Sequence, residues 1–299
     1  MLKIKEVNHQ YGTQTILEQV NFTGHPGEIL GLVAPNGAGK TTLLHIMMNF
    51  VTPSSGEVEW VTEAGTLDYQ SEKSTVEMHR VLSYLPEIED LYSELSGMDH
   101  LRLYTSLWHE ENEHTAAVVE RLNMSSYVNR PVHTYSLGMK QRLCFAMLLC
   151  ANTPVMLMDE VMNGLDPDNV DLITGILMDL KAEGKLIFIA SHLLDNLDIY
   201  ADRLLFIKDT ELIILDESDA SLFLKIEVQD HSEEDLKEMR LWTSEAELLG
   251  SGVLLLPIES FESANDWVTR ALKQGYHKQV IGSLGANEWY EKFYRQESR

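Results

Sequence analysis

The chain has 299 residues, of which 44% are hydrophobic, so it is long enough for one large core, or one core with a small appendage, and it is not a disordered or fibrous protein. Its formal net charge of −24 repels phosphate backbones and anionic lipid surfaces, so we expect no nucleic-acid partner. The longest apolar stretches fall far below the roughly 20 residues of a membrane-spanning helix, so any work at a membrane would need a separate partner.

The N-terminal part, up to about residue 62, is predicted to form strands, a glycine-rich turn and a helix. Apolar residues alternate at Leu2, Ile4 and Val7, with no basic region or apolar signal-peptide core, so secretion is not expected. Residues 28–33 are predicted as a strand and residues 40–50 as a helix with an apolar face.

The middle of the chain, from about 91 to 149, switches to a helical pattern. Leu95, Met98 and Leu101 recur at spacings of three residues, which is typical of an amphipathic helix, so this block is predicted as a helical insert. Cys144 and Cys150 fall in an apolar helical stretch, which favours buried, reduced cysteines over metal ligands or a disulfide.

The remaining pattern alternates strands and helices before it weakens. Strands at 155–158 and 186–190 alternate with helices at 166–183 and 193–200, which predicts a parallel α/β sheet. Beyond residue 216, strand signals at 222–228 and 252–257 accompany an amphipathic helix near 261–274. We interpret this tail as a small α+β appendage.

A phosphate loop is predicted between the strand at 28–33 and the helix that follows it. Gly37 and Gly39 allow backbone N–H groups to approach a polyphosphate without a Cβ clash. Lys40 would hold the β and γ phosphates, and Thr41 would offer its hydroxyl to Mg²⁺. The residues predicted to bind the nucleotide in this loop are Asn36, Gly37, Ala38, Gly39, Lys40, Thr41 and Thr42. Ala34 stands where this motif usually has its first glycine.

Two carboxylates end the predicted strand at 155–158. Asp159 is suited to a Mg²⁺-associated acid and Glu160 to a general base that polarises an attacking water. Such a pair alone would more often cap a helix, but the phosphate loop gives it a catalytic context.

The segment Tyr-Ser-Leu-Gly-Met-Lys-Gln-Arg at 135–142 resembles the signature motif of ATP-binding cassette (ABC) ATPases. The resemblance covers roughly residues 1–216, including Asn-Gly-Leu-Asp-Pro at 163–167 and Ala-Ser-His at 190–192. It implies an α/β P-loop NTPase cassette with a RecA-like parallel sheet core, an antiparallel β subdomain and a helical subdomain at about 88–150. Residues 217–299 would form the small C-terminal accessory domain.

The same resemblance implies roles for individual residues. Ser136 and Gly138 would close on the γ phosphate bound by a second ATP-binding subunit, for which an identical chain is the default. His192 would contact the γ phosphate, and Tyr11 would stack on adenine. Glu87 occupies the place where relatives carry a glutamine that touches Mg²⁺ and communicates with the membrane partner. Further departures are Leu137, where a glycine is usual, and Val161, where a proline is usual.

The loops Tyr-Leu-Pro-Glu at 84–87 and Ser-Leu-Gly-Met-Lys-Gln-Arg at 136–142 look like those of bacitracin and lantibiotic immunity exporters and related peptide and drug exporters. This resemblance implies an ATP-hydrolysing exporter subunit with ATP and Mg²⁺ as its cofactors. It would work at the cytoplasmic face of the cell membrane with integral membrane permease subunits, and its cargo would be a peptide, a drug or a lipid-like molecule. Two alternatives stay open: a soluble ABC ATPase that acts on ribosomes or DNA, and a regulatory subunit that binds ATP without turnover.

Overall fold

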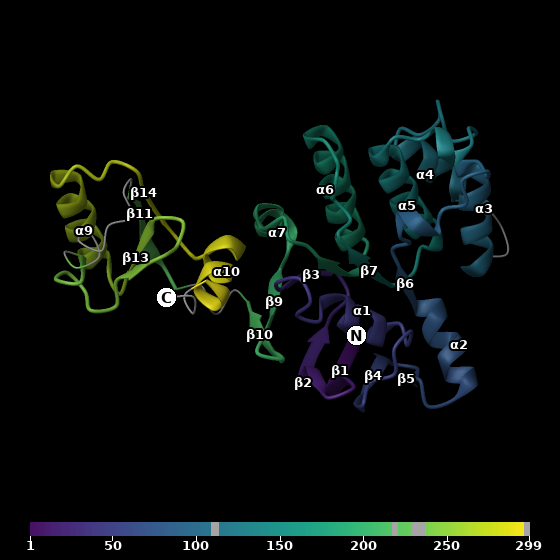
Figure 1. The fold of residues 1–299 in the computed structure, drawn as a ribbon, viewed down its shortest axis with the longest axis horizontal. Helices are drawn as coiled ribbons and strands as arrows, with labels where there is room; N and C mark the ends of the chain where they lie inside the picture. The colour runs from purple at the N-terminus through teal and green to yellow at the C-terminus, as the bar shows by residue number, and fades with distance from the viewer. Residues whose placement is uncertain (109–113, 217–220, 229–236, 238, 296–299) are drawn as a thin grey trace. The chain divides into compact units, whose positions relative to one another are not determined.

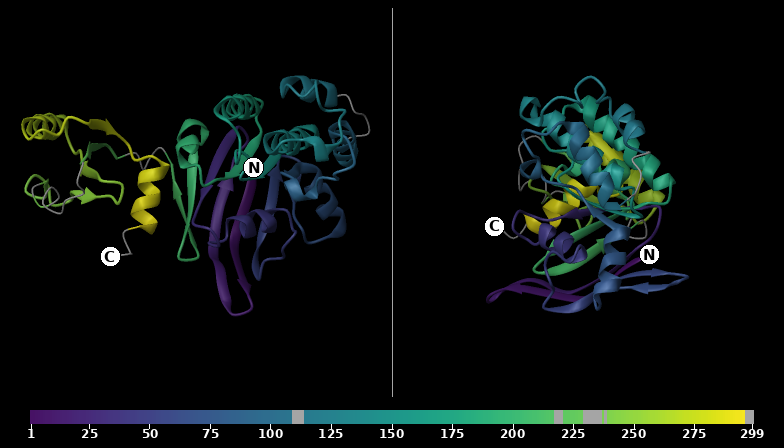
Figure 2. Two further views of the ribbon diagram at one scale, coloured as in Figure 1. Left: turned by 45° about the horizontal axis from the view of Figure 1, so that its top comes forward. Right: turned by 90° about the vertical axis from the view of Figure 1, so that its right-hand side faces the viewer.

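The computed structural model describes residues 1–108, 114–216, 221–228, 237 and 239–295 (Figures 1 and 2). By its internal contacts the chain divides into two compact units. The first unit comprises Met1–Leu193 and Ile199–Ile214, and the second unit comprises Leu194–Asp198 and Leu215–Arg299. The domain boundary after residue 216 stays a prediction, and no feature of the sequence indicates that residues 194–198 group with the tail.

The described strands of the first unit form two sheets. One is antiparallel, in the order β2-β1-β4-β5, with β1 (Leu2–Tyr11), β2 (Gln14–Gly24), β4 (Ser55–Thr62) and β5 (Gly65–Leu67). The other has the order β10-β9-β3-β8-β7-β6, with β3 (Glu28–Val33), β6 (Leu82–Tyr84), β7 (Val155–Asp159), β8 (Leu186–Ala190), β9 (Arg203–Lys208) and β10 (Glu211–Leu215). From β9 to β6 the neighbouring strands run parallel.

The parallel sheet is the centre of the first unit because its middle strands are apolar on both faces. All of β8 is buried, and β3 and β7 are buried except at one end residue each. A parallel strand covered on both faces needs a continuous apolar run rather than an alternating one. This explains why short runs such as 186–190 could be recognised as strands from the sequence.

Helices fill the connections of the first unit. They are α1 (Lys40–Met47), α2 (Glu72–Val81), η1 (Ile88–Asp90), α3 (Gly97–Trp108), α4 (Thr115–Arg121), η2 (Val132–Thr134), α5 (Leu137–Ala151) and α6 (Pro167–Ala182), with α7 (Leu194–Tyr200) shared between the units. Figure 1 shows α3, α4 and α5 packed together as the helical group that connects β6 to β7 along the chain. The predicted helix at 40–50 ends at Met47 because Asn49 takes a left-handed conformation (φ 58°).

The second unit is a small sheet covered by helices. Its described strands have the order β12-β13-β11-β14, with β11 (Phe223–Glu227), β12 (Glu247–Leu248), β13 (Val253–Pro257) and β14 (Gln279–Gly282). Its described helices include α9 (Phe261–Lys273) and α10 (Ala286–Tyr294). Leu254 and Leu256 pack in one cluster with Trp267 of α9, whereas Leu255 packs in another with Trp289 of α10. Alternate residues of β13 therefore serve opposite faces of the sheet.

Two exclusions drawn from the sequence concern membrane helices and cysteines. Within the described ranges, none of the helices has the length and apolar character that crossing a bilayer requires. Cys144 and Cys150 are buried and free, as predicted. Burial raises the pKa of the Cys144 thiol to about 12, which makes it unreactive at neutral pH.

We predict that Gly56→Ala destabilises the first unit more than Gly184→Ala does. Both glycines have positive φ (94° and 86°), where an alanine costs about 1–2 kcal/mol. A Cβ at Gly56 would also lie 2.5 Å from the Glu6 carbonyl oxygen, whereas nothing lies within 4 Å at Gly184. Thermal unfolding followed by circular dichroism should show the larger loss for Gly56→Ala. Equal losses would contradict the close approach of β1 and β4.

Candidate functional site

The predicted site residues follow the carboxyl ends of neighbouring parallel strands. In the sheet register, Leu32 of β3 lies opposite Ala190 of β8, and Ala190 lies opposite Asp159 of β7. The phosphate loop, Glu160 and His192 come directly after these residues. Because parallel strands end at a common edge, segments that are distant in the sequence meet there.

The loop between β3 and α1 has the backbone that a phosphate loop requires. Gly37 and Gly39 both have positive φ (80° and 108°), and a Cβ on Gly39 would lie 2.9 Å from Ile16 Cγ2. Ala34 is buried and is absent from the positive-φ residues of the described chain, so a Cβ is tolerated where relatives have glycine. The tip of the loop, including Asn36 and Gly37, is exposed, whereas Ala38 and Thr42 are half-buried.

Lys40 is buried at the first position of α1. Its Nζ donates to the carbonyl oxygens of Ala34 (2.7 Å) and Pro35 (3.4 Å), so the ammonium folds back onto the loop. Burial lowers the pKa of Lys40, while the nearby carboxylates of Glu160 and Asp159 raise it. The ammonium therefore contacts two backbone carbonyl oxygens and lies close enough to two carboxylates for their charge to favour its protonated form.

Thr41 and Asp159 face each other across the edge of the sheet. Thr41 Oγ1 donates a hydrogen bond to Asp159 Oδ2 at 2.6 Å. Burial raises the pKa of Asp159, the Thr41 hydrogen bond lowers it, and Glu160 raises it further. A hydroxyl and a carboxylate are hard oxygen ligands of the kind that Mg²⁺ takes when phosphate oxygens and water complete its shell. Among the described residues, no group of three or more His, Cys, Asp or Glu side chains could hold a metal. A cation here would therefore need phosphate oxygens and water as ligands in addition to protein side chains.

Glu160 is held in a sparsely populated backbone conformation, with φ 54°. Its N–H donates to the Ala190 carbonyl oxygen (2.9 Å), which extends the β7–β8 ladder by one bond. Its Oε2 lies 2.7 Å from His192 Nδ1, and the His192 N–H points at the same oxygen at 3.5 Å. Non-glycine residues with positive φ concentrate at functional sites. The structure thus pairs the predicted base with the predicted switch histidine.

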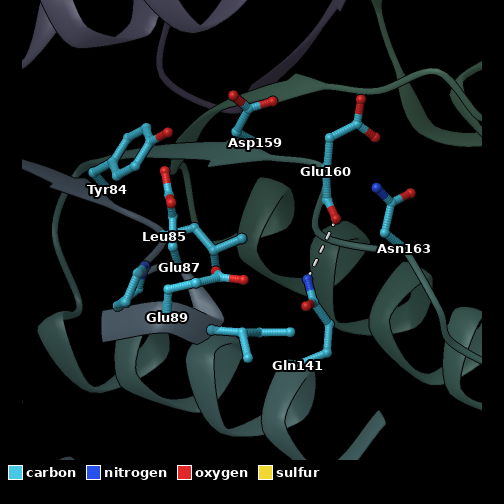
Figure 3. Close-up of a pocket in the computed structure, with 10 residues that line it drawn as sticks. Tyr84, Leu85, Glu87, Glu89, Gln141, Asp159, Glu160 and Asn163 are labelled. Carbon is cyan, nitrogen blue, oxygen red and sulfur yellow. Dashed lines mark hydrogen bonds between the residues drawn. The ribbon is translucent and has the colours of Figure 1, made fainter. Parts of the chain in front are cut away.

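Gln141 is a site residue that the sequence reasoning did not single out. Its buried side chain projects from α5, and its Nε2 donates to the backbone oxygens of Glu160 (3.3 Å) and Val161 (3.0 Å). Figure 3 shows the amide directed at the Glu160 carbonyl. The only sequence signal is its place within the signature segment. Gln141 ties the helical group to the turn that carries Glu160.

A pocket of about 310 Å³ opens beside these groups (Figure 3). Its lining residues are Tyr84, Leu85, Pro86, Glu87, Ile88, Glu89, Gln141, Asp159, Glu160 and Asn163. Glu87 is therefore brought to the same pocket as Asp159 and Glu160, although its side chain is exposed. The many carboxylates in the wall favour a cation or a water molecule over an unaccompanied anion.

Tyr11 lies at the end of β1 with about half of its surface exposed (52%). The ring of the buried His9 contacts it edge-on, with centroids 4.7 Å apart and planes at 84°. This contact fixes the tyrosine ring while leaving a face available to a planar ligand. A stacking partner would gain about 0.5–1.5 kcal/mol, by analogy with aromatic pairs.

Ser136 and Gly138 stand apart from the pocket. Ser136 is the N-cap of α5, and its Oγ accepts a hydrogen bond from the Met139 N–H (3.3 Å). Neither residue lines the pocket, and Ser136 is exposed. Leu137 packs so closely on Gly164 that a Cβ there would lie 2.8 Å from Leu137 Cδ2. The start of α5 thus contacts the loop that follows Glu160.

Comparison with known sequences identifies relatives. A family model described as "ABC transporter" matches residues 17–163. A lantibiotic transport ATP-binding protein of Streptococcus pyogenes is 32% identical over 226 residues, which is 74% of this chain and 93% of that protein. An uncharacterized ABC transporter ATP-binding protein of Bacillus subtilis is 32% identical over 71% of this chain and 68% of its own length. A fluoroquinolones export ATP-binding protein of Mycobacterium tuberculosis is 27% identical over 72% of this chain and 70% of its own length.

Solved structures also resemble this chain. The cbiO1 protein of Clostridium perfringens, part of an ABC transporter complex, is 26% identical with a TM-score of 0.60, covering 71% of this chain and 86% of that chain. A dimeric post-hydrolysis cassette, MJ0796 with ADP and Pi, has a TM-score of 0.63 at 23% identity, covering 72% of this chain and 98% of that chain. The predicted α/β cassette fold is confirmed.

We predict that Asp159→Asn stabilises the chain against unfolding at neutral pH when nucleotide and metal are left out. The pKa of Asp159 is raised above the ordinary 3.8, so the folded chain binds this proton more tightly than the unfolded chain does. Stability is therefore lost as pH rises from about 3.8 through the folded pKa, and the loss persists above it. An asparagine oxygen still accepts from Thr41 without that loss.

The measurement is urea unfolding at several pH values with a chelator present. The advantage of Asp159→Asn should be present at pH 7 and shrink towards pH 4. Asp168→Asn, at an exposed position in the first turn of α6, serves as a matched control and should show no such pH-dependent gain. Wild type more stable than Asp159→Asn at pH 7 would contradict the prediction.

Proposed function

This chain belongs to the ABC transporter family of ATP-binding proteins, and we propose that it is the ATP-hydrolysing subunit of an exporter. The observation that carries the proposal is the meeting of the phosphate loop, Asp159, Glu160 and His192 at one edge of the parallel sheet. These are the parts that in-line transfer of a phosphoryl group to water requires.

The phosphate loop binds the triphosphate of ATP. Backbone N–H groups of residues 36–42 and the positive end of α1 face the anion, and Lys40 moves its ammonium from the loop carbonyls to the β and γ phosphates. Thr41 and Asp159 would hold Mg²⁺, with Glu87 as a further carboxylate of the same pocket. When bound, the ion neutralises negative charge on the phosphates. Tyr11 stacks on the adenine ring.

Glu160 supports hydrolysis by orienting and polarising the attacking water. Its contact with His192 Nδ1 at 2.7 Å holds the carboxylate in place, and the Gln141 hydrogen bonds to the carbonyl oxygens of Glu160 and Val161 hold the backbone that carries it. His192 contacts the γ phosphate of ATP, and this contact is lost when the phosphate leaves after hydrolysis. The intact Lys40, Asp159, Glu160 and His192 favour turnover over a regulatory subunit that only binds ATP.

A second ATP-binding subunit completes each site. Ser136 and Gly138 lie on an exposed helix start away from the pocket of their own chain, which supports a role on a neighbouring chain's γ phosphate. Because this chain carries both halves of the composite site, we propose a homodimer. Closure on ATP and reopening after hydrolysis would drive the transport cycle.

Permease subunits in the membrane supply the path for cargo. The exposed loop at Glu87, next to the helical group, transmits the closing and opening of the cassettes to the permease subunits. This coupling takes place at the cytoplasmic face of the cell membrane. The named relatives act in lantibiotic transport and fluoroquinolone export, which supports a peptide, drug or lipid-like cargo moved outwards. Cargo selection would belong to the permease.

We predict that Glu160→Gln lowers kcat for Mg²⁺-dependent ATP hydrolysis about 10²–10⁴-fold while ATP binding is retained, because the amide keeps the shape of the carboxylate but cannot act as a base. The variant should also accumulate ATP-dependent dimers in gel filtration. Glu183→Gln, at the C-cap of α6, is the matched control and should behave as wild type. Unchanged kcat in Glu160→Gln would contradict the assignment of Glu160.

A further inference from the structure

His9 is a buried histidine whose two ring nitrogens have no hydrogen-bond partner among the described residues. It lies on β1, two residues before Tyr11, with 7% of its surface exposed. Buried polar groups in native structures are nearly always hydrogen-bonded, so an unpartnered one calls for an explanation. An apolar side chain of similar size would avoid the cost of desolvating the imidazole. Hydrogen bonding within the described chain therefore does not account for a histidine at this position.

The specific interaction of this imidazole is its edge-on contact with the Tyr11 ring. The ring centroids are 4.7 Å apart and the planes meet at 84°, which is a favoured geometry for an aromatic pair. Tyr11 is about half exposed, and no described residue forms a hydrogen bond with its hydroxyl. Within the described chain, His9 is also the one aromatic ring that contacts Tyr11. The orientation of the Tyr11 ring therefore depends on His9.

A β-bulge ties the hairpin of β1 and β2 to the phosphate loop. The register shifts after His9, which pairs with Leu17, because the next residue of β1 pairs with Thr15. Ile16 is thereby an extra residue on β2, and such bulges often re-aim a side chain next to a functional site. A Cβ at Gly39 would lie 2.9 Å from Ile16 Cγ2 and 3.3 Å from Leu17 Cδ2, so the phosphate loop packs directly on these two residues. One hairpin therefore carries both the ring that holds Tyr11 and the support of the phosphate loop.

We propose that His9 is a positioning residue for ATP binding: its imidazole holds the Tyr11 ring in the orientation that stacks on adenine. The inference rests on the proposed function, because it takes Tyr11 to stack on the base. All the residues involved belong to the first unit of the chain. The role concerns the base of the nucleotide rather than its phosphates, since neither ring nitrogen of His9 bonds to the phosphate loop.

The test compares two ligands, of which only one carries a base. His9→Leu should raise the dissociation constant for ATP roughly 2- to 10-fold, the range that corresponds to the loss of one stacking contact. The dissociation constant for inorganic tripolyphosphate, which has no base, should change by less than about twofold. Isothermal titration calorimetry of the full chain measures both, with Mg²⁺ chelated so that ATP is not hydrolysed. Equal weakening of both ligands, or unchanged ATP binding, overturns the positioning role.

Two further substitutions separate the aromatic ring from the polarity of the side chain. His9→Phe keeps a ring beside Tyr11 and should bind ATP within about twofold of wild type. His9→Gln keeps a polar side chain of similar size without a ring, and it should weaken ATP binding as His9→Leu does. If His9→Phe binds ATP as weakly as His9→Leu, or if His9→Gln binds it as tightly as wild type, the ring contact does not position Tyr11 and the inference fails.

Val7→Ala is the matched control for damage to β1. Val7 is a buried residue of the same strand that makes no ring contact with Tyr11. Its truncation should lower the urea midpoint of unfolding and leave the ratio of the two dissociation constants unchanged. His9→Leu should lower the midpoint less, because it removes no hydrogen bond. If Val7→Ala changes the ratio as His9→Leu does, general weakening of the strand explains the effect and the inference is overturned.

Tyr11→Ala, measured in parallel, separates this inference from the proposed function. In the Tyr11→Ala background, His9→Leu should weaken ATP binding by less than about twofold further, because both residues act through one contact, and fully additive losses would overturn the inference. If Tyr11→Ala weakens ATP binding but His9→Leu does not, the positioning role fails and the proposed function stands. If Tyr11→Ala leaves ATP binding unchanged, the stacking role fails and the inference fails with it, while the hydrolytic role of Glu160 keeps its own test.

Discussion

The parallel pairing of β3, β8 and β7 is the constraint on which the site depends. Leu32, Ala190 and Asp159 are neighbours in the register, so the chain segments that follow them must leave the sheet at one edge. A slip of one residue would turn every side chain to the opposite face and would move Asp159 away from Thr41. The apolar, two-faced burial of these strands therefore positions the carboxylates of the candidate site as well as stabilising the core.

The same edge concentrates opposite charges. Lys40 loses solvation by burial, but the carboxylates of Asp159 and Glu160 support its charged form, while Glu160 raises the pKa of Asp159. The ammonium attracts an anion and the two carboxylates attract a cation. The electrostatic potential of this group therefore favours a polyphosphate with its bound cation over either ion alone. The chain meets this need at one point although its overall charge is strongly negative.

The sequence predicted most of the cassette because its signals are local. Apolar runs gave the buried strands, and the glycines at 37 and 39 gave a loop whose positive φ angles the structure has. What it missed depends on long-range contacts. Gln141 of α5 donates a hydrogen bond to the Glu160 carbonyl oxygen, which directly follows β7. Asp195 and Asp198 accept hydrogen bonds from residues of α10 that lie 92 and 88 positions further along the chain. No periodicity or spacing encodes such pairs, so only the folded arrangement reveals them.

The departures from the family pattern can be interpreted from their surroundings. Ala34 is buried without positive φ, and Val161 is buried while its carbonyl accepts from Gln141, so neither substitution removes a group that we propose for binding phosphate or water. Leu137 is different, because it packs on Gly164 in the loop after Glu160. A glycine in its place would leave that loop without this contact. Leu137 therefore links the start of α5, which bears Ser136 and Gly138, to the loop that follows Glu160 through a packing contact that a glycine could not make.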